Sequence, residues 1–583
     1  MRNVGIILTG KILFINGKLQ GRSMKKYFTF PFILFLLSFS IVYSQVENVE
    51  LGHDVYTFLK EMKVKKIIAS VHDDMPNMSY GEVKSLLKEI EIKKDELSST
   101  ERDLLGKFKN EFFTDEYSGE NTARLFNASN SFFDNLSEFT SGKEKFLYYL
   151  QNDKLNLFVN AAGHIIHGQS FSTETSNVEF FDLGIRARGT VLDHLGYSFS
   201  FSKGGIAGSK SLAATVDPRL KYNFKFVEDI ENIPNYDYTE GYLRYEVSPA
   251  DNMLIALQLG REKIKFGYGY GNSLIISGEG PNMDILRFDF RYGIFSFSSI
   301  HASTVGEYND AIQARYSKYI ASNRMKVSIP DLFDIGVGES IVYSGRGLEW
   351  AYINPLLFYK YAEMSLQDRD NGTVFLDLQT SFIKDFEIQA TFFLDEDILS
   401  NLQDLDLFSN KTAYQFGFLW YEPFSIGNLS LTCEYTRIRP YVYSHTDYMN
   451  TFTAFGVNLG HRIGPNADEI LTKIGYNFSS RARLNLEYRH SRSGENIYNE
   501  DGTLSKNVGG DVFQPYRYDV DDTHLSFLDG IQHNYDFISA GLRLEPWREI
   551  FLDLTYTYSQ DKNLSTGNKN VISYLVCKLS IEY

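Results

Sequence analysis

Residues 552–558 read LDLTYTY, so apolar or aromatic side chains alternate with polar ones at every position. The same period of two is found at 286–291 (LRFDFR) and at 484–489 (LNLEYR). Successive side chains of a β-strand point to opposite faces, so each stretch predicts a strand with one apolar and one polar face. From about residue 154 to the end, such segments follow one another, separated by clusters of Gly, Asn and Asp.

A soluble β-sandwich would also alternate in this way. Three features favour a transmembrane barrel instead. The segments reach the ~10 residues that a tilted membrane strand needs, they continue without a helical interruption, and aromatic residues recur near their ends. In lipid only helices and closed barrels satisfy every backbone group. We therefore predict an all-β fold over residues 151–583. It is a transmembrane antiparallel β-barrel of about 18 strands, in the range of roughly 18 to 22, preceded by a small N-terminal helical segment.

The last nine residues, 575–583, read LVCKLSIEY. One face of this strand ends in Tyr583 and also carries Cys577. A terminal aromatic residue on an amphipathic last strand looks like the signal by which Gram-negative outer-membrane barrels are inserted. We expect the barrel-insertion machinery and outer-membrane lipid as partners. Cys433 falls on an apolar strand face like Cys577, and we expect both cysteines to face lipid.

Composition excludes several other classes of protein. The chain has 583 residues, 15% of them aromatic, which argues against disorder. Two cysteines rule out a disulfide scaffold. The mean hydropathy of −0.26 and the lack of repeated long apolar runs argue against a polytopic helical membrane protein. A net charge of −16 and a pI near 5.3 argue against a nucleic-acid partner.

Residues 1–44 read as a signal region. Lys25 and Lys26 precede an apolar run at 27–43, and the run ends in small and polar residues. This pattern is typical of a secretory signal, and the alternative is a transmembrane anchor. We expect the true start at Met24 and cleavage near Ser44/Gln45, so that the mature protein reaches the cell outer membrane.

Residues 45–150 are predicted as a helical periplasmic or plug segment followed by a linker. Apolar residues recur at helical spacing from about 49 to 113. Ser79 with Glu82, and Ser98 with Glu101, have the spacing of capping boxes. The helices form either a soluble bundle or a segment against or inside the pore, and residues 114–150 read as the linker.

Three stretches differ from ordinary strands: 260–277 (GREKIKFGYGYGNSLIIS), 345–359 (GRGLEWAYINPLLFY) and 456–469 (GVNLGHRIGPNADE). Together they resemble the capsule assembly Wzi family of outer-membrane barrels, and in particular its Bacteroidetes branch with gliding-motility-associated relatives. The resemblance implies a barrel of 18 strands with a helical element. It also implies a surface lectin for capsular polysaccharide, with motility or secretion components as further partners.

The same stretches supply the candidate ligand-binding residues. Glycine at every second position from 267 to 271 lets a ligand or another backbone approach closely, and a barrel kink or a plug contact is the alternative. Aromatic faces stack on sugars, and Arg, Asn and Asp bond to hydroxyl groups; a constriction loop with internally paired charges is equally compatible. For Arg261 and Arg287, pairing with Glu262 or Asp284 is preferred over sugar binding. The candidates are Arg261, Tyr268, Tyr270, Asn272, Arg287, Arg346, Glu349, Trp350, Tyr352, Asn354, Tyr359 and Asp370.

Three classes of function are ranked. The first is binding or organising surface polysaccharide, the second is a porin-like channel for saccharides or small solutes, and the third is an outer-membrane enzyme. No nucleophile elbow and no zinc-protease motif is found, so we expect no enzyme and no cofactor. His461 with Asp468 and Glu469 lacks metal-ligand spacing, so no metal is expected. The insert 491–534 reads as a long exposed loop.

Overall fold

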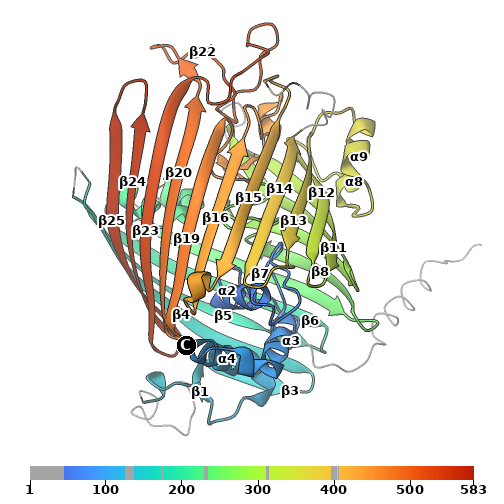
Figure 1. The fold of residues 1–583 in the computed structure, drawn as a ribbon, viewed down its shortest axis with the longest axis vertical. Helices are drawn as coiled ribbons and strands as arrows, with labels where there is room; N and C mark the ends of the chain where they lie inside the picture. The colour runs from blue at the N-terminus through green and yellow to red at the C-terminus, as the bar shows by residue number, and fades with distance from the viewer. Residues whose placement is uncertain are drawn as a thin grey trace, which may run out of the picture. The chain divides into compact units, whose positions relative to one another are not determined.

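The computed structural model describes residues 45–124, 137–172, 175–228, 234–309, 314–395, 404 and 406–583. The predicted signal region, 1–44, lies outside the described residues. Within the described part, eighteen long antiparallel strands close into one barrel (Figure 1). The predicted fold is therefore confirmed, at the lower end of the expected range of strand numbers.

Each barrel strand pairs with its neighbours in the sequence, and β25 closes the barrel by pairing with β4. The barrel strands are β4 (Leu155–Ser170), β5 (Asn177–Val191), β6 (Leu195–Gly208), β7 (Asn235–Val247), β8 (Met253–Glu262), β9 (Met283–Tyr292), β10 (Phe295–Asn309), β11 (Ala314–Ile329), β12 (Phe333–Ser344), β13 (Asn371–Thr380), β14 (Phe386–Asp395), β15 (Thr412–Tyr421), β16 (Leu429–Ile438), β19 (Ala467–Ser479), β20 (Ala482–Glu495), β23 (Ile531–Trp547), β24 (Ile550–Asn563) and β25 (Lys569–Glu582).

Short elements occupy the connections and the N-terminal region. The segment expected as a linker contributes β1, β2 and β3, and β3 extends the barrel sheet beside the first residues of β4. These elements are β1 (Thr122–Arg124), β2 (Glu144–Phe146), β3 (Tyr148–Asn152), α6 (Lys210–Val216), α7 (Phe224–Glu228), α8 (Trp350–Ile353), α9 (Tyr359–Ser365), β17 (Thr453–Ala454), β18 (Val457–Asn458), β21 (Ile497–Tyr498) and β22 (Leu504–Lys506).

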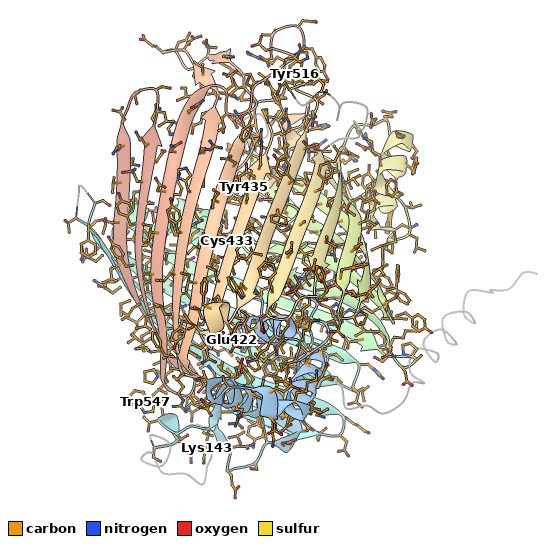
Figure 2. All side chains as sticks on the ribbon, in the orientation of Figure 1. Lys143, Glu422, Cys433, Tyr435, Tyr516 and Trp547 are labelled. Atoms are coloured by element: carbon orange, nitrogen blue, oxygen red, sulfur yellow. The ribbon has the colours of Figure 1, made fainter. Side chains whose placement is uncertain are left out.

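The two ends of the barrel differ in their connections. At one end the strands are joined by tight turns, such as those between β19 and β20 and between β23 and β24. At the other end lie long connections, including 263–282, 345–370, 439–466 and 496–530. Figure 2 shows Trp547 at the short-turn end and Tyr516 at the long-loop end. Short turns are periplasmic and long loops extracellular in such barrels.

The predicted alternation places apolar side chains outside and charged ones inside. On β9, Leu286 and Phe288 lie on the outer face, and Arg287 and Asp289 are buried in the interior. An exposed apolar belt surrounds the barrel, as lipid requires. Its members include Phe181, Leu183, Ile185, Leu257, Leu259, Val337, Leu376 and Ile470. Cys433 and Cys577 are free thiols on β16 and β25, which are not neighbours.

Three helices lie at the short-turn end of the barrel: α2 (Asp54–Val64), α3 (Tyr80–Ile92) and α4 (Ser99–Phe112) (Figure 1). Both predicted capping boxes are present, at the starts of α3 and α4. The apolar faces of the helices form one core that includes Leu419 and Tyr421 of β15. We call residues 45–116 the plug. No helix among the described residues combines the length and apolar character needed to cross a bilayer.

Ion pairs attach the plug to the barrel on all sides. Their barrel partners lie on β5, β9, β11, β12, β14, β20 and β23 and in two short turns. The pairs, plug residue first, are Glu47–Arg188, Glu50–Arg186, Asp54–Arg543, Lys60–Glu387, Glu61–Arg483, Lys63–Asp334, Lys63–Glu387, Lys65–Glu422, Asp74–Arg324, Asp74–Lys326, Glu82–Arg291, Lys107–Glu545 and Glu111–Arg548.

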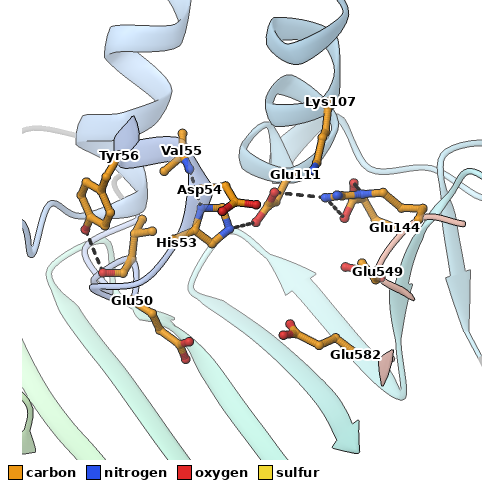
Figure 3. Close-up of polar contacts among 12 residues, drawn as sticks. Glu50, His53, Asp54, Val55, Tyr56, Lys107, Glu111, Glu144, Glu549 and Glu582 are labelled. Atoms are coloured by element: carbon orange, nitrogen blue, oxygen red, sulfur yellow. Dashed lines mark hydrogen bonds and ion pairs between the residues drawn. The ribbon is translucent and has the colours of Figure 1, made fainter. Parts of the chain in front are cut away.

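One branch of this network is shown in Figure 3. His53 Nε2 lies 2.7 Å from Glu111 Oε1, and Glu111 Oε2 accepts a hydrogen bond of 3.0 Å from Arg548. Arg548 also donates to both oxygens of Glu144, at 2.6 and 3.0 Å. Arg548 sits in the turn after β23, so it ties the plug and β2 to the rim of the barrel.

Removing a buried carboxylate of the plug should weaken the attachment of the plug to the barrel far more than removing a half-exposed one. Replacing Asp74 by Ala leaves Lys326 buried without its partner, and this should cost about 3–5 kcal/mol of plug attachment. Asp54→Ala is the matched control, because its pair with Arg543 is about 40% exposed on both sides, and the expected cost is below about 1 kcal/mol. Native-state proteolysis of the plug measures both. Equal effects would contradict the assignment of Asp74 as a main anchor.

The plug should also loosen as the pH falls. Burial, with the positive charges of Arg291 and Lys326, lowers the pKa of His72 to about 3. In the released plug the same ring titrates near its ordinary value of 6.5. Stability from neutral His72 is thus complete above about pH 6.5 and is lost as the pH falls toward 3. Protease protection of the plug should fall in this window, and less steeply in His72→Gln; identical slopes would contradict the prediction.

Candidate functional site

The connection 263–282 between β8 and β9, which we call the inward loop, folds into the lumen. Gly267 N–H donates to the backbone oxygen of Asp74 in the plug, at 2.9 Å. Gly271 N–H donates to Glu434 Oε1 on the wall, also at 2.9 Å. Gly267 has a φ of +92°, and a Cβ there would lie 2.8 Å from Ser273 Oγ. These glycines permit close contact with the plug and the wall, which is one of the two predicted alternatives.

The inward loop builds an apolar core against part of the wall. Leu274, Ile275 and Ile276 are fully or almost fully buried. They pack with interior residues of the consecutive strands β9 to β16 and with the loop 439–466. The further members include Phe266, Met283, Ile285, Ile300, Ile320, Val342, Phe375, Phe393, Ile438, Tyr443, Phe452 and Leu459. Eight consecutive strands are therefore packed against protein in the interior.

The other side of the inward loop borders a cavity of about 780 Å³, which we call the lysine cavity. Tyr56 and Lys60 of α2 line it on the plug side. The inward loop contributes Lys263, Lys265, Tyr268 and Tyr270, and the wall contributes Lys473, Arg483 and Glu487. A second cavity of about 530 Å³, toward β23 and β24, shares Glu61 and Arg483 with it.

Positive charge in the lysine cavity is only partly neutralised. Among the described residues, no carboxylate lies within ion-pair distance of Lys263 or Lys265. Burial and the neighbouring Lys473 lower the pKa of Lys265. The Tyr268 hydroxyl is buried and has no hydrogen-bond partner in the described part of the chain. A buried, unpartnered hydroxyl beside excess positive charge suits a ligand that carries both hydroxyl groups and a negative charge.

Tyr270 and Asn272 are held in the same loop by the wall and by neighbouring loops. The Tyr270 hydroxyl donates to Glu387 Oε1 at 2.9 Å, and its backbone N–H donates to Glu434 Oε2 at 2.7 Å. Asn272 accepts a 2.7 Å hydrogen bond from Arg462 and donates to Glu279. Of the predicted candidates, Tyr268 and Tyr270 line the lysine cavity, and Asn272 supports the loop beside it.

The two candidate arginines from strands are engaged by carboxylates. Arg261 lies on the outer face of β8 and binds both oxygens of Asp284, each at 2.7 Å. Arg287 is buried inside the barrel, with its Nε 2.8 Å from Asp289. Asp284 is one of the two carboxylates predicted as partners of Arg261. Arg287 pairs instead with Asp289, two positions along its own strand, which is not one of the two predicted partners.

The candidates from 345–371 lie elsewhere, on the outer wall. Arg346 and Tyr352 both bind Asp370, with Arg346 Nη1 2.8 Å from Oδ1 and the Tyr352 hydroxyl 2.8 Å from Oδ2. Tyr359 donates to Asn323 on the outer face of β11, at 2.9 Å. Glu349, Trp350 and Asn354 flank or form α8, and Trp350 and Asn354 are exposed. The structure does not bring these residues together with the lysine cavity.

The sequence reasoning missed the lysines. Lys263 and Lys265 lie within the stretch 260–277, whose predicted ligand-binding residues are Arg261, Tyr268, Tyr270 and Asn272. Lys473 falls on the interior face of β19, a position that the alternation alone specifies. Lys60 could not be found, because nothing in the sequence places α2 opposite the inward loop.

A closed barrel with an apolar outer belt, a charged interior and a helical plug defines an outer-membrane β-barrel protein. The chain belongs to the family described as capsule assembly protein Wzi, whose model matches residues 218–570, more than half of its length. The resemblance seen in the sequence is thereby confirmed at the level of the family. No curated protein sequence matches the chain.

Among solved structures, the chain is similar to Wzi of Escherichia coli, an outer membrane protein involved in group 1 capsule assembly and described as a carbohydrate-binding β-barrel. The TM-score is 0.55 at 11% identity, over 92% of this chain and 99% of that one. OccK8 (OprE) of Pseudomonas aeruginosa matches with a TM-score of 0.42 at 9% identity, over 73% of this chain and 98% of that one. OpdK of the same organism, solved with vanillate, gives 0.43 at 8% identity, with the same coverage.

Proposed function

We propose that this outer-membrane barrel binds an acidic surface polysaccharide and that sugar residues of the polymer occupy the lysine cavity. The observation that carries the proposal is the pair Lys263 and Lys265, which face a lumenal cavity with no carboxylate partner among the described residues. The family described for capsule assembly, and the carbohydrate binding named for the Escherichia coli protein, support a saccharide as the ligand.

The lysine cavity has the size and chemistry for this ligand. Its volume of about 780 Å³ lies within the range of small-molecule sites. Ammonium groups form strong charge-assisted hydrogen bonds to carboxylates. Tyr56 and Tyr270, whose hydroxyl groups are bonded to Val49 and Glu387, offer aromatic surface for the apolar face of a sugar ring. An acidic sugar would engage both features at once.

The finer parts of the proposal rest on the sequence motifs. A role in retaining or organising surface polysaccharide, without catalysis, fits the description of the family. The likeness of 260–277, 345–359 and 456–469 to the Bacteroidetes branch extends the proposal to gliding motility or secretion partners. Cleavage of the signal near Ser44/Gln45 belongs to the same proposal.

Binding of oligogalacturonate to the purified, full-length protein tests the assignment. The double variant Lys263→Ala/Lys265→Ala should lower the affinity at least tenfold, since two charge-assisted bonds of about 1.5–3 kcal/mol each are removed. Lys569→Ala, an exposed lysine at the start of β25, should leave the affinity unchanged. Isothermal titration calorimetry measures all three proteins, with neutral dextran as a ligand control.

Equal binding of dextran and oligogalacturonate would contradict the acidic ligand. Binding of oligogalacturonate that the double variant retains would remove the site from the lysine cavity while leaving a saccharide-binding function. The heat-modifiable mobility of the folded barrel in gels confirms that each variant is folded.

A further inference from the structure

The segment 345–370 packs against the outside of the barrel beside β11, β12 and β13, as Figure 1 shows for α8 and α9. The backbone N–H of Tyr359 donates to Glu339 Oε1 on β12, at 2.8 Å. Glu339 is on the same strand face as Val337, which is exposed to lipid. The segment therefore covers wall that would otherwise face the membrane.

The covered wall is polar, which is unusual for the outer face of a membrane barrel. Asn323 of β11 accepts from the Tyr359 hydroxyl, and His301 of β10 lies 2.8 Å from the Tyr343 hydroxyl. Glu339 is almost fully buried. Polar groups in contact with lipid must be satisfied by protein; the segment satisfies Asn323 and Glu339, and Tyr343 of β12 satisfies His301.

The opposite surface of the segment exposes large apolar side chains, with polar ones at Asn354 and, close to its C-terminal end, at 367–369. Trp350 is 77% exposed, Leu356 87% and Tyr361 70%. Glu363, by contrast, is buried toward the wall and pairs with Lys360. The distribution is the reverse of that on a helix in water, where polar residues face outward. The exposed apolar residues, which we call the apolar face, are Leu348, Trp350, Leu356, Leu357, Phe358, Tyr361 and Met364.

The height of the lipid belt identifies what covers this face. On β12 the uncovered outer wall runs only from Phe333 to Val337 before Glu339 begins the polar patch. At a rise of ~3.3 Å per residue and a tilt of ~40°, five residues give about 13 Å. The apolar band of such barrels is about 25 Å tall. On β11 the uncovered wall ends likewise at Met325, below Asn323.

We propose that the apolar face of 345–370 is immersed in the outer leaflet of the outer membrane and completes the lipid belt over β11–β13. Its occupant is the acyl-chain region of the lipid. Trp350, which the sequence predicts as a sugar-binding residue, then contacts lipid. The segment also fixes the depth and tilt of the barrel on this side. The inference is independent of the lysine cavity.

Depth-dependent fluorescence quenching tests the proposal. The chain has three tryptophans, so Trp420→Phe/Trp547→Phe leaves Trp350 alone. In a background that also carries Trp350→Phe, Leu183→Trp places a tryptophan in the lipid belt of β5, and Val520→Trp places one in an exposed loop. Each single-tryptophan protein is folded into phosphatidylcholine vesicles with brominated acyl chains, and aqueous acrylamide is the second quencher.

Trp350 should be quenched by brominated lipid at least half as strongly as Leu183→Trp, and only weakly by acrylamide. Quenching by acrylamide at the level of Val520→Trp would overturn the proposal. Protection from both quenchers would also overturn it, because protein, such as a second copy of the chain, would then cover the face. A spin label on Met364→Cys, with Cys433 and Cys577 replaced by Ala, gives a second reading. Stronger relaxation by oxygen than by a water-soluble nickel complex is expected, and the reverse would contradict the proposal.

Discussion

The pairing of plug charges with charges of the barrel wall is the interaction on which the rest of the structure depends. An interior lined by Arg188, Arg291, Arg324 and Arg483 would be costly to leave without partners in a filled lumen. The plug supplies Glu47, Glu82, Asp74 and Glu61 to these four residues. Because the partners lie on strands around the barrel, the plug is fixed in position and orientation. Its apolar core packs against Leu419 and Tyr421 of β15.

The inward loop 263–282 depends on this arrangement. Gly267 bonds to the backbone of Asp74, the same residue whose side chain binds Arg324 and Lys326. The loop thus rests on the plug from above and packs against β9–β16. The space that remains is the lysine cavity, bounded by plug, loop and wall. The residues that line the lysine cavity come from the plug, the inward loop and the wall, so no single stretch of the sequence predicts the cavity.

The same physical demand is met on the outside of the barrel. Glu339 and Asn323 on the outer face need partners that lipid cannot supply, and the segment 345–370 provides them. Inside the barrel, charged side chains of the plug pair with charged side chains of the wall. Outside the barrel, the segment 345–370 forms hydrogen bonds to the polar wall and presents an apolar surface to lipid. In both cases a chain segment outside the barrel strands provides the partners for polar groups of the wall.

Much of the fold follows from local rules that the sequence displays. The period of two specifies strand faces correctly on β9, and the spacing of Ser79 and Glu82 specifies the start of α3. The side of the barrel on which a connecting segment lies is not encoded locally. Arg346, Trp350 and Asp370 have the composition of a sugar site, yet their position on the outer wall is set by contacts of their segment with Glu339 and Asn323 on the preceding strands β12 and β11. Lys60 reaches the cavity only through the docking of α2.

The plug and the inward loop occupy the lumen, so we expect the protein to work by binding and not by conduction. Conductance of the full-length protein in planar lipid bilayers tests this most directly. We expect no steady conductance above that of the lipid alone at moderate voltage. A stable, ohmic conductance of the wild-type protein would contradict it and would favour a channel for saccharides or small solutes.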